Sequence, residues 1–222
     1  PRLYRCSSVT TDVSNRPELR SQSVASVIAA REIELMQTEQ ALRLVTRDLF
    51  RQLQRDHMLY AEIRFAPLLH TKEGLAAQEV VSIVDRAVRA ASRETGVEAR
   101  LLLCTLRSYA EAQSMETVKL VEQFRGSSVV GLDLAGSEAD FSLDAHIPAF
   151  QYAEAHGIPC TAHAGEACGP ESMWETLHHL TPNRIGHGVG SVKDTALLAY
   201  LREHDIHLAT EQLLVLGHHF QS

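Results

Sequence analysis

The chain has 222 residues, of which 45% are hydrophobic, and a formal net charge of -7 at pH 7. This length allows one domain with a sizeable buried core, and the acidic balance argues against a nucleic acid as partner. The four cysteines are irregularly spaced, without a Cys-x-x-Cys pair, so no disulfide framework is indicated. No apolar run is long enough to cross a membrane, and we expect a cytoplasmic protein that acts on a small molecule, without membrane binding.

From residue 38 onward, short apolar runs alternate with longer amphipathic segments, which is typical of repeated β-α-β units. The expected strands are 60–66, 99–106, 129–134, 159–164, 184–187 and 206–210. Several of them are apolar without alternation, as strands covered on both faces usually are. Apolar residues recur at helical spacing within 41–53, 80–91 and 115–124, so helices are expected in the gaps between strands.

Glycine, proline and serine residues mark the expected helix ends. Gly126 and Gly157 stand where two helices should stop, and the pair Gly169-Pro170 places a proline at a helix start. The spacing from Ser191 to Asp194 predicts a capping box at the beginning of the last helix.

Six strands with five connecting helices suit either a doubly wound sheet or most of an eight-stranded barrel. The glycine-rich phosphate loops that would favour a doubly wound sheet do not occur in the sequence. Polar residues instead follow the carboxyl ends of successive strands, where barrel enzymes place their sites. We therefore predict one α/β domain over residues 1–222, a TIM-type (β/α)₈ barrel that is incomplete and has about six strands.

Two of these strand ends carry residues suited to catalysis. His163 and Glu166 leave the strand 159–164 together, separated by two residues, and His187 ends the next strand between two glycines. A histidine can bind a metal ion and a glutamate can donate a proton, so one pocket could hold both functions. Glycines beside His187 allow backbone and ring to approach closely. A tight turn without catalytic function is the alternative interpretation of His187.

Four blocks carry a resemblance to a known family. Tyr60–Pro67, Gly131–Gly136, His163–Glu166 and Arg184–Gly188 occur in the order and rough spacing of the adenosine deaminase family. The chain resembles the bacterial-type members over about residues 36–208. The ends 1–35 and 209–222 do not match.

This resemblance implies a zinc-dependent hydrolytic deamination of adenosine to inosine and ammonia, with adenine or another 6-aminopurine conjugate as alternative substrate. It implies that His163 is a metal ligand, that Glu166 passes a proton to the purine ring, and that His187 orients or deprotonates the attacking water. Gly136 would offer its backbone to the purine. Asp133 would support a histidine of the metal site from behind.

The implied chemistry is physically coherent. Displacement of an aromatic amino group requires a strong nucleophile at neutral pH, which zinc supplies by lowering the pKa of bound water to about 7. It also requires a ring that accepts electrons, which protonation of a ring nitrogen provides. A partly apolar pocket around the glutamate would help to deliver that proton.

Two pairings remain open. Asp133 lies in an otherwise apolar strand, and it either pairs with an arginine such as Arg64 or serves the site. Glu62 and Arg64 point to the same side of their strand, so they could form an ion pair inside the barrel or contact substrate.

The sequence also departs from the family. Members carry His-x-His in a first strand and a pair of aspartates in a last strand, and neither occurs within 1–37 or after 206–208. Ser137 stands where the family usually has an acidic residue before the glutamate, here Glu138. With one of four expected zinc ligands, the chain is expected to bind zinc weakly. We expect the first and last strands to be missing and two sheet edges to be unpaired, which favours self-association. The alternative function is a catalytically inactive barrel fragment that acts by association.

Overall fold

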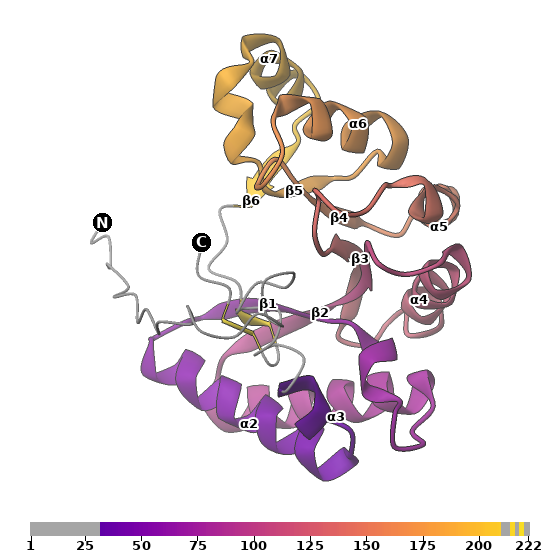
Figure 1. Cartoon of the computed structure of the whole chain (residues 1–222). Coiled ribbons are helices and arrows are strands. Elements are labelled where there is room, and N and C mark those ends of the chain that lie inside the picture. Colours follow the sequence, from indigo (N-terminus) through magenta and orange to yellow (C-terminus); the bar gives the residue numbers. More distant parts are fainter. Residues whose placement is uncertain (1–31, 210–213, 216–217, 220–222) are drawn as a thin grey trace, which may run out of the picture.

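A computed structural model describes residues 32–209 and the backbone of 214–215 and 218–219. Six parallel strands neighbour one another in chain order, and helices cover the outer side of the sheet (Figure 1). The strands are β1 (Tyr60–Phe65), β2 (Glu98–Leu106), β3 (Val129–Ala135), β4 (Cys160–Ala164), β5 (Arg184–His187) and β6 (His207–Ala209). The predicted α/β fold of TIM type with about six strands is therefore confirmed. Most of the unmatched ends, and with them Cys6, the first of the four cysteines, lie outside the described residues.

Each connection between neighbouring strands contains an α-helix, and a further helix precedes β1. The helices are α2 (Glu39–Arg55), α3 (Ala77–Thr95), α4 (Glu111–Gln123), α5 (Ile147–Ala155), α6 (Pro170–Leu180) and α7 (Thr195–Glu203). Short 3-10 turns are η2 (Pro67–His70), η3 (Asp144–His146) and η4 (Val189–Lys193). The helical periodicities of the sequence thus predict α2, α3 and α4 correctly. No helix in the described part of the chain has both the length and the apolar character needed to cross a membrane.

The helix ends follow from local chemistry. The Thr38 side chain accepts a hydrogen bond from the Ala41 N–H and so begins α2. Gly157, with φ +63, follows the last residues of α5, and Pro170 opens α6 after Gly169, as predicted. The predicted capping box at Ser191 is wrong. Residues 189–193 form η4, so the first free amides of α7 face the carboxylate of Asp194 instead, which accepts from Ala196 and Leu197.

The sheet is strongly curved, and one ion pair shows this directly. Glu62 on β1 and Arg184 on β5 are separated by three strands in the sheet order, yet their side chains meet at 2.6 Å between Oε2 and Nη1. A flat sheet would hold strands four places apart about 19 Å from one another, at about 4.8 Å per strand. The inner face of the curved sheet therefore brings together side chains from strands that are not neighbours.

Burial is concentrated between the outer face of the sheet and the helices. The larger hydrophobic cluster joins β1 to β4 with α2 to α5, and Phe50, Phe65 and Phe150 are almost completely buried in it. A smaller cluster packs β4 and β5 on α6 and α7; it consists of Ala164, Met173, Leu177, Ile185, Leu197 and Leu201. This second cluster anchors the two strands whose ends carry the predicted site.

One edge of the sheet differs from expectation. β7 (Leu214–Val215) pairs with β1 in parallel at Arg64 and Val215, and β8 (His218–His219) pairs with β7 in an antiparallel manner. The outer edge of β1 is therefore not left unpaired, because a segment after β6 returns to it. β6 is the edge strand at the other end of the described sheet. Self-association through open edges stays a prediction.

Candidate active site at the strand ends

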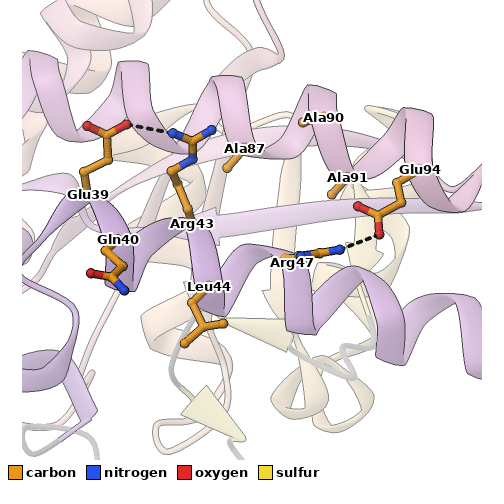
Figure 2. Close-up of a pocket in the computed structure, with 9 residues that line it drawn as sticks. All are labelled: Glu39, Gln40, Arg43, Leu44, Arg47, Ala87, Ala90, Ala91 and Glu94. Carbon is orange, nitrogen blue, oxygen red and sulfur yellow. Dashed lines mark hydrogen bonds and ion pairs between the residues drawn. The ribbon is translucent and has the colours of Figure 1, made fainter.

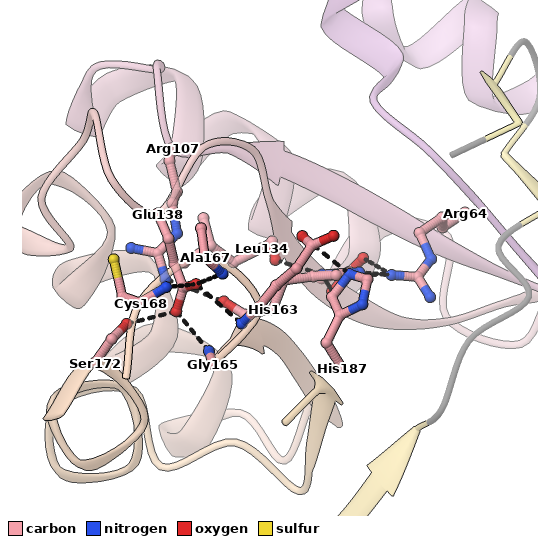
Figure 3. A network of polar contacts seen from close by, with 12 residues as sticks. Arg64, Arg107, Leu134, Glu138, His163, Gly165, Ala167, Cys168, Ser172 and His187 are labelled. Carbon is pink, nitrogen blue, oxygen red and sulfur yellow. Dashed lines mark hydrogen bonds and ion pairs between the residues drawn. The ribbon is translucent and has the colours of Figure 1, made fainter. Parts of the chain in front are cut away.

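The three residues predicted to act together converge at the carboxyl ends of β4 and β5. Oε2 of Glu166 lies 3.4 Å from Nε2 of His187, and the ring centroids of His163 and His187 are 5.3 Å apart. Figure 3 shows His163 and His187 in a network of polar contacts. His163 is nearly buried and His187 is 17% exposed, whereas the Glu166 side chain is 52% exposed. The site is therefore open at the glutamate, which does not lie in the partly apolar pocket expected for it.

Strand register explains the convergence. In the pairing of β4 with β5, His163 stands opposite Gly186 and Ala164 opposite His187. A Cβ on Gly186 would approach Cδ2 of His163 to 2.8 Å, so only glycine leaves room for the imidazole there. The backbone of His187 is left-handed, with φ +63. Such a conformation is uncommon for a residue with a side chain, and it is found preferentially at functional sites.

Beneath His163 lies a buried ionic cluster. Oδ2 of Asp133 accepts from Nη1 of Arg64 at 3.1 Å and from Sγ of Cys104 at 3.0 Å, while Oδ1 lies 3.2 Å from Nδ1 of His163. Asp133 has no solvent exposure. Burial alone would raise the pKa of Asp133, but His163 and the guanidinium of Arg64 outweigh it and hold that pKa well below its usual range. The carboxylate is therefore ionised at neutral pH.

These contacts answer the two open questions about pairing. Asp133 pairs with Arg64 and also contacts His163, while its function in the site stays a prediction. Of the two possibilities left open for Glu62 and Arg64, the ion pair between them does not form. Side chains two residues apart on a strand run parallel, and curvature of the sheet offers each a better partner on another strand, Arg184 for Glu62 and Asp133 for Arg64.

The hydrogen bonds of His163 define its tautomer. Nδ1 lies 2.8 Å from the carbonyl oxygen of Leu134, which can only accept, so Nδ1 carries the proton. The lone pair of the neutral ring is then on Nε2. That nitrogen contacts the guanidinium of Arg64, which can only donate. An aspartate and a carbonyl behind Nδ1 are the partners that typically orient a histidine toward a metal ion.

The described residues do not complete a zinc site. Within 32–209, no group of three or more His, Cys, Asp or Glu side chains is placed to hold a metal ion. A catalytic zinc normally has three protein ligands. In addition, the lone pair of His163 that a metal would use faces the cationic side chain of Arg64. As they stand, these residues do not fit a catalytic zinc ion.

Glu138 is a residue of the site to which the sequence assigned no function. Its carboxylate accepts hydrogen bonds from four consecutive backbone amides, those of residues 165–168, at 2.6 to 3.1 Å, and from the Ser172 hydroxyl at 2.5 Å. Burial alone would raise the pKa of Glu138, but the Ser172 hydroxyl and the amides hold it below its ordinary value. An acidic residue three positions after the end of β3 was the only sequence signal available.

Arg107 is a second residue that the sequence did not predict. It follows β2 directly, is 4% exposed, and donates from Nη2 to the carbonyl oxygen of His163 at 3.0 Å. Burial lowers the pKa of Arg107 from its ordinary value, and Glu138 opposes this shift. Gly136, the predicted backbone contact for substrate, is exposed directly after β3 with φ +108. A Cβ on Gly136 would come within 3.2 Å of the backbone nitrogen of Arg107.

A buried serine and histidine elsewhere have the geometry of a nucleophile and base but no access to substrate. Oγ of Ser114 lies 2.6 Å from Nδ1 of His146, and both residues are completely buried. Nε2 of His146 donates to the carbonyl oxygen of Arg107 at 3.2 Å, and Ser114 also contacts Thr105 at 2.6 Å. This chain of bonds connects α4 and η3 to the end of β2.

A groove of about 800 Å³ lies between α2 and α3. Figure 2 shows its lining, Glu39, Gln40, Arg43, Leu44, Arg47, Ala87, Ala90, Ala91 and Glu94. Ion pairs at its rim join Glu39 to Arg43 and Arg47 to Glu94. None of the predicted site residues lines it.

The fold and the strand-end cluster define a barrel-type α/β protein with a site of two histidines and a glutamate. The adenosine deaminase family model matches residues 22–211, which extends beyond the 36–208 expected from the motifs. This chain therefore belongs to the adenosine deaminase family.

Individual relatives agree with that assignment. The chain is 35% identical over 176 residues to an adenosine deaminase of Clostridium kluyveri, covering 79% of this chain and 51% of the relative. It is 36% identical over 174 residues to an adenosine deaminase of Haemophilus ducreyi, covering 76% and 50%. The chain thus spans about half the length of the curated relatives it matches.

Solved structures with the same fold include an adenine deaminase of Arthrobacter aurescens, with a TM-score of 0.74 and 26% identity over 82% of this chain and 55% of that one. An Arabidopsis N6-mAMP deaminase has a TM-score of 0.71 and 26% identity, and the match covers 79% of this chain and 53% of that one. A Burkholderia ambifaria amidohydrolase with bound Zn has a TM-score of 0.77, and the match covers 84% of this chain and 52% of that one. Its sequence identity of 23% supports the fold alone.

Proposed function

We propose that the strand-end cluster belongs to an aminohydrolase that converts adenosine to inosine and ammonia. The observation that carries the proposal is the convergence of Glu166, His187 and His163 on one side of the barrel rim. Relatives named as adenosine deaminases at about 35% identity support the same reaction class. Solved neighbours are named as deaminases of adenine and of N6-mAMP, so adenine or another 6-aminopurine conjugate is the alternative substrate.

In the proposed reaction, Glu166 gives a proton to a purine ring nitrogen, which makes the carbon that bears the amino group more electrophilic. His187, 3.4 Å from Glu166, orients the attacking water and takes up its proton. Gly136 offers its backbone to the purine from the end of β3. The Leu134 carbonyl oxygen fixes the tautomer of His163, and Asp133 contacts the same ring nitrogen from below.

For zinc, the proposal is limited to one residue of this chain. We propose His163 as a ligand in a protein where further ligands, not found among residues 32–209, complete the set. The preformed Nδ1–H tautomer of His163 supports this, whereas its contact with Arg64 opposes it. A cytoplasmic location stays a prediction, as do a small-molecule partner and the lack of a nucleic-acid partner.

The test is adenosine deamination by the full chain, monitored through the fall in adenosine absorbance, with zinc content measured in the same samples. Glu166→Gln should lower kcat by about 10²–10⁴-fold, because that range is typical of a lost general acid. Glu171→Gln, at an exposed position in the first turn of α6, is the matched control and should retain activity.

A second function, an inactive barrel fragment that acts by association, is favoured by two observations: His163 is the one proposed metal ligand among residues 32–209, and Arg64 faces it. It predicts no turnover and no bound zinc even with excess metal. Turnover that is equal in the native chain and in Glu166→Gln would contradict the proposed mechanism, because the proton would then come from another group.

A further inference from the structure

We propose that Glu138 is a positioning residue, whose carboxylate holds the turn 165–168 so that Glu166 is directed at His187. The turn joins the end of β4 to the start of α6, and its four amides all point at the same carboxylate (Figure 3). This inference rests on the proposed function only for the chemical role of Glu166. The geometry of the turn can be tested independently of activity.

The need for an anion at this place follows from the backbone. Amides between a strand and a helix have no partners in the regular hydrogen-bond ladders, and buried or half-buried amides must be satisfied. Four successive N–H groups that face inward form a concave nest that favours negative charge. The amino-terminal end of α6 adds its partial positive charge next to it. Glu138 supplies the negative charge that this nest favours. It does so from the segment after β3, which is distant in sequence from the turn.

The carbonyl side of the same turn is fixed as well. The Gly165 oxygen accepts from the Gly190 amide at 2.9 Å, and the Ala164 oxygen accepts from the Gly188 amide at 3.0 Å. Gly165 itself has φ +72, and a Cβ there would meet Sδ of Met173 at 2.6 Å. The turn is thus bonded to the segment after His187 through its carbonyls and to Glu138 through its amides.

Glu166 depends on this arrangement more than the two histidines do. His163 and His187 are held by strand pairing, but Glu166 lies in the turn, and half of its side chain is exposed. The Glu166 amide itself donates to Oε2 of Glu138 at 3.1 Å. Loss of the Glu138 carboxylate would therefore release the backbone of Glu166, and displacements of about 1 Å can cost about 10²-fold in rate.

The main experiment removes the carboxylate and returns it from solution. In Glu138→Ala the four amides and the Ser172 hydroxyl remain, so added acetate or formate can occupy the vacated nest. We expect faster hydrogen exchange at the amides of 165–168 and a fall in kcat of about 10²-fold with KM nearly unchanged. Acetate should restore both the protection from exchange and kcat. Chloride at equal ionic strength should not restore them.

Two further variants guard against a simple loss of folding. Glu138→Gln keeps the size of the side chain but turns an NH₂ donor toward amide donors, so it should resemble Glu138→Ala without acetate rescue. Glu138→Asp should recover part of the protection and part of kcat. Asp140→Ala is the matched control, because the Asp140 carboxylate accepts from Ser137 rather than from the turn.

The outcomes separate this inference from the proposed function. If the native chain has no deaminase activity, the proposed function fails. The role of Glu138 can still be tested by comparing the native chain with Glu138→Ala, through hydrogen exchange at 165–168 and through the nuclear Overhauser effect between Glu166 and His187. Native-like exchange at 165–168 in a folded Glu138→Ala chain would overturn the inference. So would loosened amides with an unchanged kcat in an active chain, since the turn would then not control Glu166.

Discussion

Two carboxylates organise the two layers of this site, and they are stabilised in different ways. Asp133 lies below His163 and has no exposure; its partners are the charged guanidinium of Arg64, the ring of His163 and the Cys104 thiol. Glu138 lies beside the turn at the rim, is half-buried, and has backbone amides and one hydroxyl as partners. The lower layer thus depends on side chains from four strands, with the ion pair between Arg64 and Asp133 at its centre, and the upper layer depends on the backbone.

The difference has a thermodynamic consequence. A fully buried ion pair is costly to break, because the remaining partner stays charged and poorly solvated. A half-buried carboxylate in a nest of amides can be replaced by water at lower cost, since the amides can turn to solvent. Changes at Asp133 should therefore act mainly on global stability, and changes at Glu138 mainly on local order of the turn.

The largest expected effect follows from removal of the lower charge. Asp133→Asn keeps the shape but removes the carboxylate charge buried against Arg64, so the free energy of unfolding should fall by about 3–5 kcal/mol. Urea denaturation of the full chain measures it. Asp140→Asn, at an exposed carboxylate, is the control. A loss below about 1 kcal/mol, the range of surface ion pairs, would mean that Arg64 finds another counter-charge.

A smaller effect is expected when the lower layer is disturbed without a change of charge. In Gly186→Ala the new Cβ would lie 2.8 Å from Cδ2 of His163, so the imidazole must leave its present position. Overpacking of this kind costs about 1–3 kcal/mol. Thermal unfolding measures the cost, and the ring resonances of His163 report the displacement. Unchanged resonances would show that β5 moves instead of the imidazole.

The contribution of Glu138 to stability should depend on pH. Because the folded-state pKa of Glu138 is lowered, its contribution to stability is present above the ordinary glutamate pKa of about 4.3 and is lost as pH falls through the lower folded value. The stability difference between the native chain and Glu138→Gln should therefore be constant near neutral pH and shrink below about pH 4.3. Denaturation series at several pH values measure it. A difference that grows on acidification would contradict the lowered pKa.

Much of this architecture could be predicted from the sequence, because buried parallel strands read as apolar runs and their carboxyl ends meet at one rim. The six strands and the convergence of His163, Glu166 and His187 follow from that rule alone. The partners of the two carboxylates could not be predicted in this way. Pairing of Arg64 with Asp133 depends on curvature of the sheet. The partners of Glu138 are mainly backbone amides, and the direction of an amide N–H cannot be predicted from the type of residue that carries it.

The smallest expected effect comes from one hydroxyl of the upper layer. Ser172 donates to Oε1 of Glu138 at 2.5 Å from the first turn of α6, and Ser172→Ala removes this bond while the four amide bonds remain. A single hydrogen bond of this kind contributes about 0.5–1.5 kcal/mol. Urea denaturation should show a loss in this range, with the amides of 165–168 still protected from exchange. If Ser172→Ala instead loosens the amides as much as Glu138→Ala does, the helix and not the backbone nest fixes the carboxylate, and the contrast between a charge-held lower layer and a backbone-held upper layer would no longer stand.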